Sequence, residues 1–165
     1  MAPSLFCIVL FFRRKAPEGA GGTVCMKITR RTQLREAAFI ILFRADYYDL
    51  EEMPGQIRSF FEDEDEFSEE EKQYIAARVL NVCEKIEEID KALDEISVGW
   101  KVRRMNHSDL TALRLAYYEI IYDDSVPDAA AINDAVELAK NYGTDNSGSF
   151  VNGILAKVVQ NAGKE

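Results

Sequence analysis

Histidine and cysteine are scarce in this chain of 165 residues. His107 is the one histidine, so a Ser-His-Asp triad or a multi-histidine metal site would have to be built around a single imidazole. The three cysteines, Cys7, Cys25 and Cys83, are odd in number and have no metal-ligand spacing, which indicates a reducing compartment rather than a disulfide framework. The sequence therefore offers few parts for enzyme chemistry, and we expect Cys83 to be a small core residue.

The first 25 residues differ from the rest of the chain. Their apolar run, Leu5 to Phe12, is too short to span a bilayer, and its basic residues follow it, whereas those of a secretory signal precede it. Gly21-Gly22 could be a translated ribosome-binding sequence, which would place the natural start at Met26. We therefore expect residues 1–25 to be a non-native or disordered extension, with a genuine flexible segment as the alternative, and residues 26–165 to form one domain.

Charge is distributed unevenly along the chain. The full sequence has 20 basic and 29 acidic residues. Residues 1–25 contain three of the basic residues and one acidic residue, so 17 and 28 remain in residues 26–165, a net charge of −11. An acidic body of this kind should repel nucleic acid, yet residues 26–44 carry five basic residues and one acid, which makes one end basic. The acidic run from Glu62 to Glu66 is interpreted as a solvated loop.

Apolar residues at steps of three and four predict helices through most of residues 26–165. We expect a first helix that follows an N-cap at Thr32 and reaches Tyr48, and a short helix after Pro54. The last three predicted helices run from about Ser108 to Tyr122, Asp128 to Tyr142 and Ser147 to Gln160. No strand pattern appears, so the predicted fold class is all-α, a compact bundle of six or seven helices.

A longer helix is predicted in the middle of the chain. Ser68 and Glu71 have the spacing of a capping box, and apolar residues from Ile75 to Ile96 then alternate steps of four and three until Gly99. Such a heptad could form a coiled coil. A single heptad helix among shorter amphipathic ones is more typical of the central member of a bundle, which is our prediction.

The stretch KNYGTDNSGSFVNGIL, residues 140–155, separates the last two predicted helices. Gly148 and Gly153 have the spacing of a phosphate-binding Walker A loop. However, Ile154 and Leu155 stand where that loop needs its Lys and its Ser or Thr, so the sequence excludes this kind of phosphate site.

The same stretch is interpreted as a corner between two helices. Gly143 stands where a C-cap glycine belongs, and Phe150 is expected to fill the core. Gly153 is expected to permit close contact between helices. The N-cap of the following helix is one of three polar residues, Asp145, Asn146 or Ser147.

Three segments resemble the NusB family of transcription antitermination factors. AINDAVELAKNYGTDNSGSFVNGILAKV (131–158) closely resembles the C-terminal signature of that family. RRTQLREAAFIILF (30–43) resembles its arginine-rich first helix, and LTALRLAYYEIIYDDSVPDAAAIN (110–133) resembles its fifth helix and the turn into the sixth. The resemblance extends from Met26 to about Val159.

The resemblance implies a seven-helix adaptor of the bacterial cytoplasm that catalyses no reaction and uses no cofactor or metal. With the ribosomal protein NusE, such an adaptor binds the boxA element of nascent RNA and joins the RNA polymerase antitermination complex with other Nus factors, notably in ribosomal RNA operons. Arginine contacts to phosphates supply attraction, and polar groups in a loop read exposed bases. No membrane is involved, and whether the chain forms a homodimer stays open.

The family's RNA surface combines the arginine-rich N-terminus with the corner between the last two helices. The matching RNA-binding positions in this chain are Lys27, Arg30, Arg31, Arg35, Asn146 and Ser147. The positions that match contacts with the protein partner are Phe43 and Asp109. We expect the polar corner to supply selectivity for RNA sequence and the basic residues to supply attraction. Gly148-Ser149 replaces residues that are often larger or basic in the family, which favours weaker affinity for RNA alone.

Several of these residues have a structural alternative. Arg35 could make only surface ion pairs, since Glu36 is nearby. Arg114 and Glu119 lie in an apolar helix, where we expect a structural ion pair. His107 is interpreted as a loop or cap residue, because a catalytic base would need a carboxylate partner that the sequence does not single out.

Alternatives also exist for the function. Trp100, followed by Lys101, Arg103 and Arg104, could form a second nucleic-acid patch, although packing is the favoured interpretation of a lone tryptophan after a core helix. A stand-alone RNA-binding domain that assists a ribosomal RNA methyltransferase is one alternative to the adaptor. A purely protein-binding helical module, in which the arginines are incidental, is the other.

Overall fold

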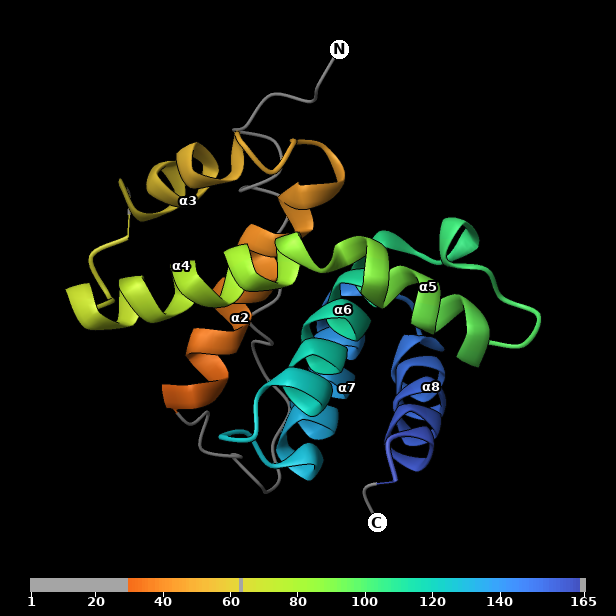
Figure 1. The fold of residues 1–165 in the computed structure, drawn as a ribbon. Coiled ribbons are helices and arrows are strands. Elements are labelled where there is room, and N and C mark those ends of the chain that lie inside the picture. Colours follow the sequence, from red (N-terminus) through yellow and green to blue (C-terminus); the bar gives the residue numbers. More distant parts are fainter. Residues whose placement is uncertain (1–29, 63, 164–165) are drawn as a thin grey trace.

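The computed structural model describes residues 30–62 and 64–163 as an all-α fold, which confirms the predicted fold class. These ranges contain seven α-helices, two short 3-10 helices and no strand (Figure 1). Lys27 and residues 1–25 lie outside the described residues. The elements are α2 (Arg30–Leu42), η1 (Phe43–Asp46), α3 (Met53–Glu62), α4 (Glu69–Glu84), α5 (Ile86–Ile96), η2 (Val102–Arg104), α6 (His107–Tyr122), α7 (Asp128–Tyr142) and α8 (Ser147–Asn161).

The first helix differs from its prediction at both ends. Arg30 and Arg31 are already helical, so Thr32 is not the N-cap. At the other end α2 stops at Leu42 and the chain tightens into η1, which is a common way for an α-helix to finish. Arg44 in η1 is buried, and its Nη1 donates to the backbone oxygen of Gln56 at 3.0 Å, which ties η1 to α3.

The long heptad helix is two helices in the structure. The predicted capping box is confirmed, because Ser68 accepts from the Glu71 backbone N–H and the Glu71 side chain accepts from that of Ser68. The prediction of one continuous helix is wrong, since α4 ends at Glu84 and α5 begins at Ile86. Lys85 adopts φ −111° and ψ 6°, and its N–H donates to Val82 three residues back. The break lets α4 pack on α2 while α5 packs on α6 and α8.

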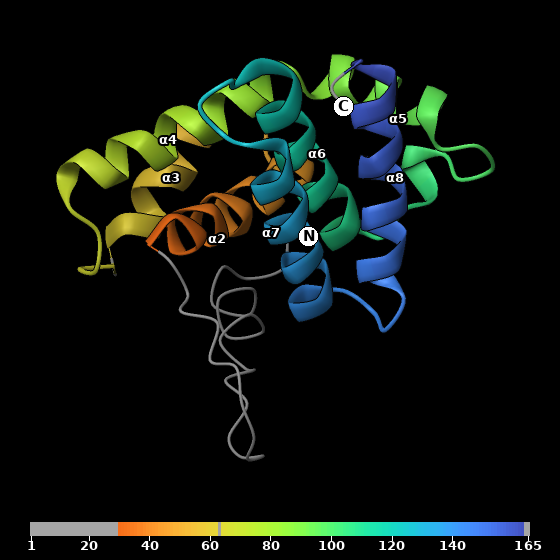
Figure 2. The ribbon, with the colours of Figure 1, turned by 90° about the horizontal axis from the view of Figure 1, so that it is seen from below.

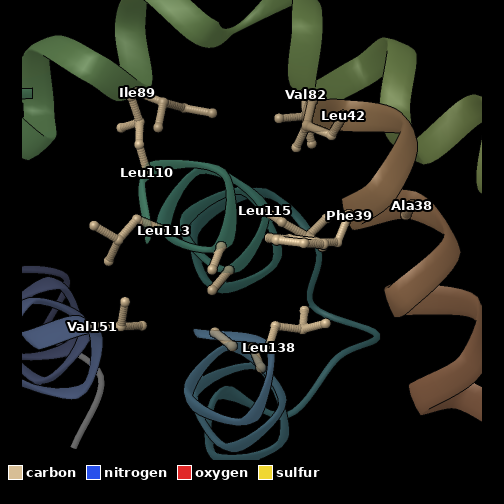
Figure 3. Close-up of a cluster of buried hydrophobic side chains, with 14 of the residues drawn as sticks. Ala38, Phe39, Leu42, Val82, Ile89, Leu110, Leu113, Leu115, Leu138 and Val151 are labelled. Atoms are coloured by element: carbon tan, nitrogen blue, oxygen red, sulfur yellow. The ribbon is translucent and has the colours of Figure 1, made fainter. Parts of the chain in front are cut away.

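Helix α6 is the centre of the bundle. In two perpendicular views α2, α3 and α4 lie on one side of α6, and α5 and α8 lie on the other (Figures 1 and 2). Its side chains are buried in several directions, as expected for a helix that is surrounded. In the close-up, Leu115 lies near Phe39 of α2 and Leu113 extends towards Val151 of α8 (Figure 3).

None of the helices among the described residues is long and apolar enough to cross a membrane. The interior of the bundle consists of aliphatic side chains from every long helix, together with the fully buried aromatic ring of Phe39. Cys83 is partly buried and packs against this core, in agreement with its predicted place. Burial raises the pKa of the Cys83 thiol to about 11, which makes it a poor nucleophile at neutral pH.

Candidate nucleic-acid interface

The predicted site residues form two groups along α2. Arg30 and Arg31 lie in the first turn of α2, whereas Phe43 follows its last turn. The helical rise of 1.5 Å per residue places these two ends about 18 Å apart. The corner between α7 and α8 lies beside the C-terminal half of α2, because Tyr142 at the end of α7 packs on Phe39 with ring centroids 5.0 Å apart.

The corner itself is held by Ser147. The Ser147 Oγ accepts from the backbone N–H of Thr144 at 2.8 Å and lies 3.2 Å from the Thr144 Oγ1. Gly143 ends α7 as predicted, but its backbone is extended rather than left-handed. A Cβ at Gly143 would lie 2.6 Å from the Ala139 oxygen and would also clash with Ser147, so close approach is what requires glycine here.

The two predicted base-reading residues differ in accessibility. Ser147 is 1% exposed, so it shapes the corner from inside. Asn146 is exposed at the N-cap position of α8, but its side chain makes no capping hydrogen bond. Because its amide is not used for capping, Asn146 is the corner residue that can offer both a donor and an acceptor to a base.

The predicted roles of Gly153 and Phe150 in α8 need correction. Gly153 was expected to permit close helix contact, yet a Cβ there would have open space. The close contact is at Gly148, where a Cβ would lie 2.9 Å from the Lys140 side chain. Phe150 is only partly buried, and its ring packs against the edge-on ring of Trp100, 6.1 Å away, at the border of the core.

Asp109 connects the start of α6 to the corner. Its side chain is buried, and within residues 30–62 and 64–163 its Oδ1 has no hydrogen-bond partner. Burial raises the pKa of Asp109, and a hydrogen bond from Ser147 opposes that rise. Asp109 is therefore buried against the corner, where its side chain contacts Ser147 and has little exposed surface.

Three aromatic rings, those of Phe43, Tyr47 and His107, lie at the same end of the bundle as the corner between α7 and α8. The His107 ring stacks on Tyr47 at 5.9 Å between centroids, and Phe43 lies edge-on to His107 at 6.3 Å. Tyr47 and His107 are both exposed. Tyr47 is a contribution that the sequence analysis missed, although its position four residues after Phe43 was an available signal.

His107 has a carboxylate partner that the sequence did not reveal. Its Nδ1 lies 2.8 Å from Oδ2 of Asp46 in η1, while Oδ1 of Asp46 accepts from Nη1 of Arg114 at 2.7 Å. Although burial opposes the change, hydrogen bonds from His107 and Arg114 lower the pKa of Asp46. Arg114 also pairs with Asp90 at 2.6 Å, so this group is an ion-pair network that fixes the ring of His107.

Arg30 is exposed but already engaged. Its guanidinium donates to both carboxylate oxygens of Glu71 at 2.6 Å and to the backbone oxygen of Glu66 at 2.7 Å. It also lies 5.0 Å from the centroid of the Phe67 ring. The Arg30 hydrogen bond lowers the pKa of Glu71 to about 2. Among the described residues Arg31, in contrast, has a 3.4 Å contact with the Ser125 oxygen, and there it is the less restrained of the two guanidinium groups.

Arg35 belongs to a buried ion-pair network. Its Nε lies 2.9 and 3.0 Å from the two oxygens of Glu119 in α6, and its Nη1 pairs with Asp134 in α7. Arg78 in α4 approaches Glu119 at 3.7 Å and pairs with Asp123. The ion-pair alternative for Arg35 thus fits the geometry better than RNA binding, although the partners are distant in sequence and Glu36 is not one of them.

The expected ion pairing of Arg114 and Glu119 also takes another form. Both residues make buried ion pairs, but with different helices instead of with each other: Arg114 binds Asp46 and Asp90, and Glu119 binds Arg35. Burial raises the pKa of Glu119, and the nearby guanidinium groups oppose that rise. The Glu119 network joins α2, α4, α6 and α7, while the Arg114 pairs join α6 to α5 and η1.

Comparison with known proteins identifies similar chains. The sequence profile described as the NusB family matches residues 32–160. A transcription antitermination protein NusB of Lachnoclostridium phytofermentans is 46% identical over 132 residues, which cover 80% of this chain and 99% of that protein. The solved structure of T. maritima NusB superposes with a TM-score of 0.69 at 31% identity and covers 80% of this chain and 92% of its own.

One solved structure is a complex. It is described as antitermination factors NusB and NusE in complex with dsRNA, and it matches with a TM-score of 0.70 at 26% identity. The match covers 79% of this chain and 96% of that one.

Proposed function

The chain belongs to the NusB family of transcription antitermination proteins, a non-enzymatic family, and from that premise we propose that it binds boxA-type single-stranded RNA together with NusE. In this role it acts in the bacterial cytoplasm as an adaptor of the RNA polymerase antitermination complex with other Nus factors. Support for the pairing of RNA and NusE comes from the similar structure in which antitermination factors NusB and NusE are in complex with dsRNA.

The observation that carries the proposal is the exposed, uncapped Asn146 at a corner that is otherwise rigid. Ser147 and Gly143 fix the backbone of the corner, so only the side chain of Asn146 has to be ordered when a base binds. Bases of a single strand are recognised through hydrogen bonds to their edges and through stacking on aromatic rings. The exposed Tyr47 and His107 rings at the same end of the bundle supply the second kind of contact.

The roles of the arginines follow from their environments. Arg31 is exposed, and within the part of the chain that the structure describes it is restrained only by a long contact, so it is well placed for a phosphate. Arg30 can contribute only when it leaves Glu71, and phosphate is a chemically equivalent partner for its guanidinium. Arg35 supports the bundle beneath this surface. Lys27 completes the proposed basic segment from outside the described residues.

The acidic body supports the protein half of the proposal. A net charge of −11 over residues 26–165 should steer a basic ribosomal protein and accelerate its association, and added salt should slow it. Phe43 offers an aromatic anchor at the end of α2, next to Tyr47 at 6.1 Å between ring centroids. Calorimetry with the host's NusE at low ionic strength tests this half, and absence of a complex would contradict it.

The RNA half is tested by anisotropy titrations of boxA RNA and a scrambled RNA with NusE present. Asn146→Ala should weaken binding to boxA RNA more than binding to scrambled RNA, because a base contact is lost. Arg31→Ala should weaken both equally and reduce the salt slope by about 0.7, since a phosphate contact carries no sequence information. Arg58→Ala, a change of an exposed arginine on α3, is the matched control. Equal affinities for all four proteins would contradict the proposal.

The two alternatives predict different outcomes. A purely protein-binding module would bind NusE but show no RNA affinity in the same titration. A detached domain of a methyltransferase would show RNA binding without dependence on NusE. The adaptor is favoured, because the match to the curated relative covers 99% of that antitermination protein.

A further inference from the structure

An exposed tryptophan follows α5, outside the proposed RNA surface of Arg31, Tyr47, His107 and Asn146. Trp100 is the one tryptophan of the chain, and 54% of it is exposed. Val98, two residues earlier, is 85% exposed. Tryptophan is highly buried on average, so a half-exposed indole next to an exposed valine offers an apolar contact that the fold itself does not use fully.

The loop that carries Trp100 is ordered by its own hydrogen bonds. The Ser97 Oγ lies 2.7 Å from the Leu93 oxygen and 2.6 Å from the Trp100 oxygen. Gly99 has φ +89°, a left-handed conformation that glycine adopts without strain. The Trp100 ring is held in turn by the Phe150 ring of α8, at an angle of 70°. The indole is therefore presented in a fixed position, which lowers the entropic cost of binding.

Positive charge follows the ring directly. Lys101, Arg103 and Arg104 are exposed, and among the described residues neither Arg103 nor Arg104 has an ion-pair partner. Of the two aspartates of α5, Asp90 binds Arg114, and an oxygen of Asp94 accepts from the Val102 N–H at 2.6 Å. On an acidic protein this is a local cationic patch beside an exposed aromatic ring.

The patch is continuous with the corner between α7 and α8. The Phe150 N–H donates to the Asn146 oxygen at 3.0 Å, so the two residues are one helical turn apart. One turn rises about 5.4 Å, and the Phe150 ring then touches Trp100. An RNA strand that contacts Asn146 would therefore pass close to Trp100 if it continued along the start of α8. In Figure 2, α5 and α8 lie next to each other on this side of the bundle.

We propose that Trp100, Arg103 and Arg104 form a second nucleotide-binding site, which stacks a base of the single-stranded RNA beside the element bound at the corner. This inference rests on the proposed function. A ring for stacking and free guanidinium groups for phosphates are the two components of sequence-tolerant single-strand binding. A protein partner fits less well, because two exposed apolar side chains are a small part of the 1,200 Å² or so that a stable interface buries.

The test compares two fluorescent RNAs with the full chain and NusE: the element alone, and the same element extended by unstructured oligouridine on either side. Trp100→Ala should weaken binding of the extended RNA by about ten-fold, as expected for one lost stacked base, and leave binding of the element alone unchanged. Trp100→Phe should restore most of the affinity. Arg103→Ala with Arg104→Ala should reduce the salt dependence for the extended RNA only. Leu50→Ala removes an exposed apolar side chain elsewhere and is the control.

A second readout comes from the protein itself. Because Trp100 is the one tryptophan, its intrinsic fluorescence should be quenched by the extended RNA and little affected by the element alone. Unchanged fluorescence, or equal loss of affinity for both RNAs in Trp100→Ala, would overturn the inference. Loss of the NusE complex with RNA affinity retained would replace it with a protein-docking role. If the unaltered protein binds neither RNA, the proposed function fails first and this inference with it.

Discussion

Replacing Glu119 with glutamine should destabilise the protein strongly. The Glu119 side chain is 2% exposed, and both of its oxygens accept from Arg35. Glutamine keeps the shape of the side chain but removes the negative charge that compensates Arg35 and Arg78. Breaking a buried ion pair on one side costs about 3–5 kcal/mol, because the remaining charge stays buried.

The structure places this substitution towards the lower end of that range. Arg35 keeps its pair with Asp134, and Arg78 keeps its pair with Asp123, so neither guanidinium becomes fully uncompensated. We therefore expect a loss of about 3 kcal/mol in the free energy of unfolding. Because domains of this size have a total of about 5–15 kcal/mol, the loss is large enough to measure without ambiguity.

Urea unfolding followed by far-ultraviolet circular dichroism measures the effect. Glu137→Gln is the matched control, because Glu137 pairs with Lys140 at 2.7 Å on the exposed face of α7. Such an exposed pair contributes under about 1 kcal/mol. A Glu119→Gln protein as stable as the Glu137→Gln protein would refute the structural role assigned to the network and would free Arg35 for reconsideration as an RNA contact.

Two further predictions concern the ends of the surface. In an NMR titration the Glu71 carboxyl should titrate near pH 2, and Arg30→Ala should return its midpoint towards 4.5. Since the pKa is lower in the folded state, the ion pair stabilises the fold above about pH 4.5, and its contribution is lost as the pH falls towards 2. An unshifted midpoint in the unaltered protein would contradict the contact. Gly143→Ala should destabilise the protein by about 1–3 kcal/mol through a clash with the Ala139 oxygen, whereas Gly153→Ala, in open space within a helix, should stabilise it by about 0.5–1 kcal/mol. Thermal unfolding measures both variants, and melting temperatures that shift in the same direction would show that the packing at one glycine is misassigned.

The sequence predicted those features of the fold that depend on local chemistry. The Ser68 capping box and the bounds of α7 at Asp128 and Tyr142 follow from residues that lie close together in the chain. The break at Lys85 could not be read from the heptad, since apolar spacing continues through it. That break follows from tertiary packing, in which α4 and α5 cover different neighbours.

The site shows the same limit more clearly. Arg30 and Arg35 occupy one helix and were both predicted to bind RNA, with a surface ion pair as the alternative for Arg35. In the structure Arg30 is exposed, whereas Arg35 is buried against Glu119, which is 84 residues away in the chain. Asn146 and Ser147 are neighbours with opposite exposure, because the Ser147 hydroxyl turns inward to Thr144. Which residue of such a pair faces a ligand depends on contacts between distant segments, and helical spacing does not contain them.

The central claim is that this chain recognises a boxA-type RNA in partnership with NusE. The most direct measurement is an anisotropy titration of boxA RNA and of a scrambled RNA of equal length with the unaltered protein, each with and without NusE. We expect modest binding by the chain alone and a clear gain for boxA RNA when NusE is present, which exceeds the gain for the scrambled RNA. Equal affinity for the two RNAs in the presence of NusE would contradict it.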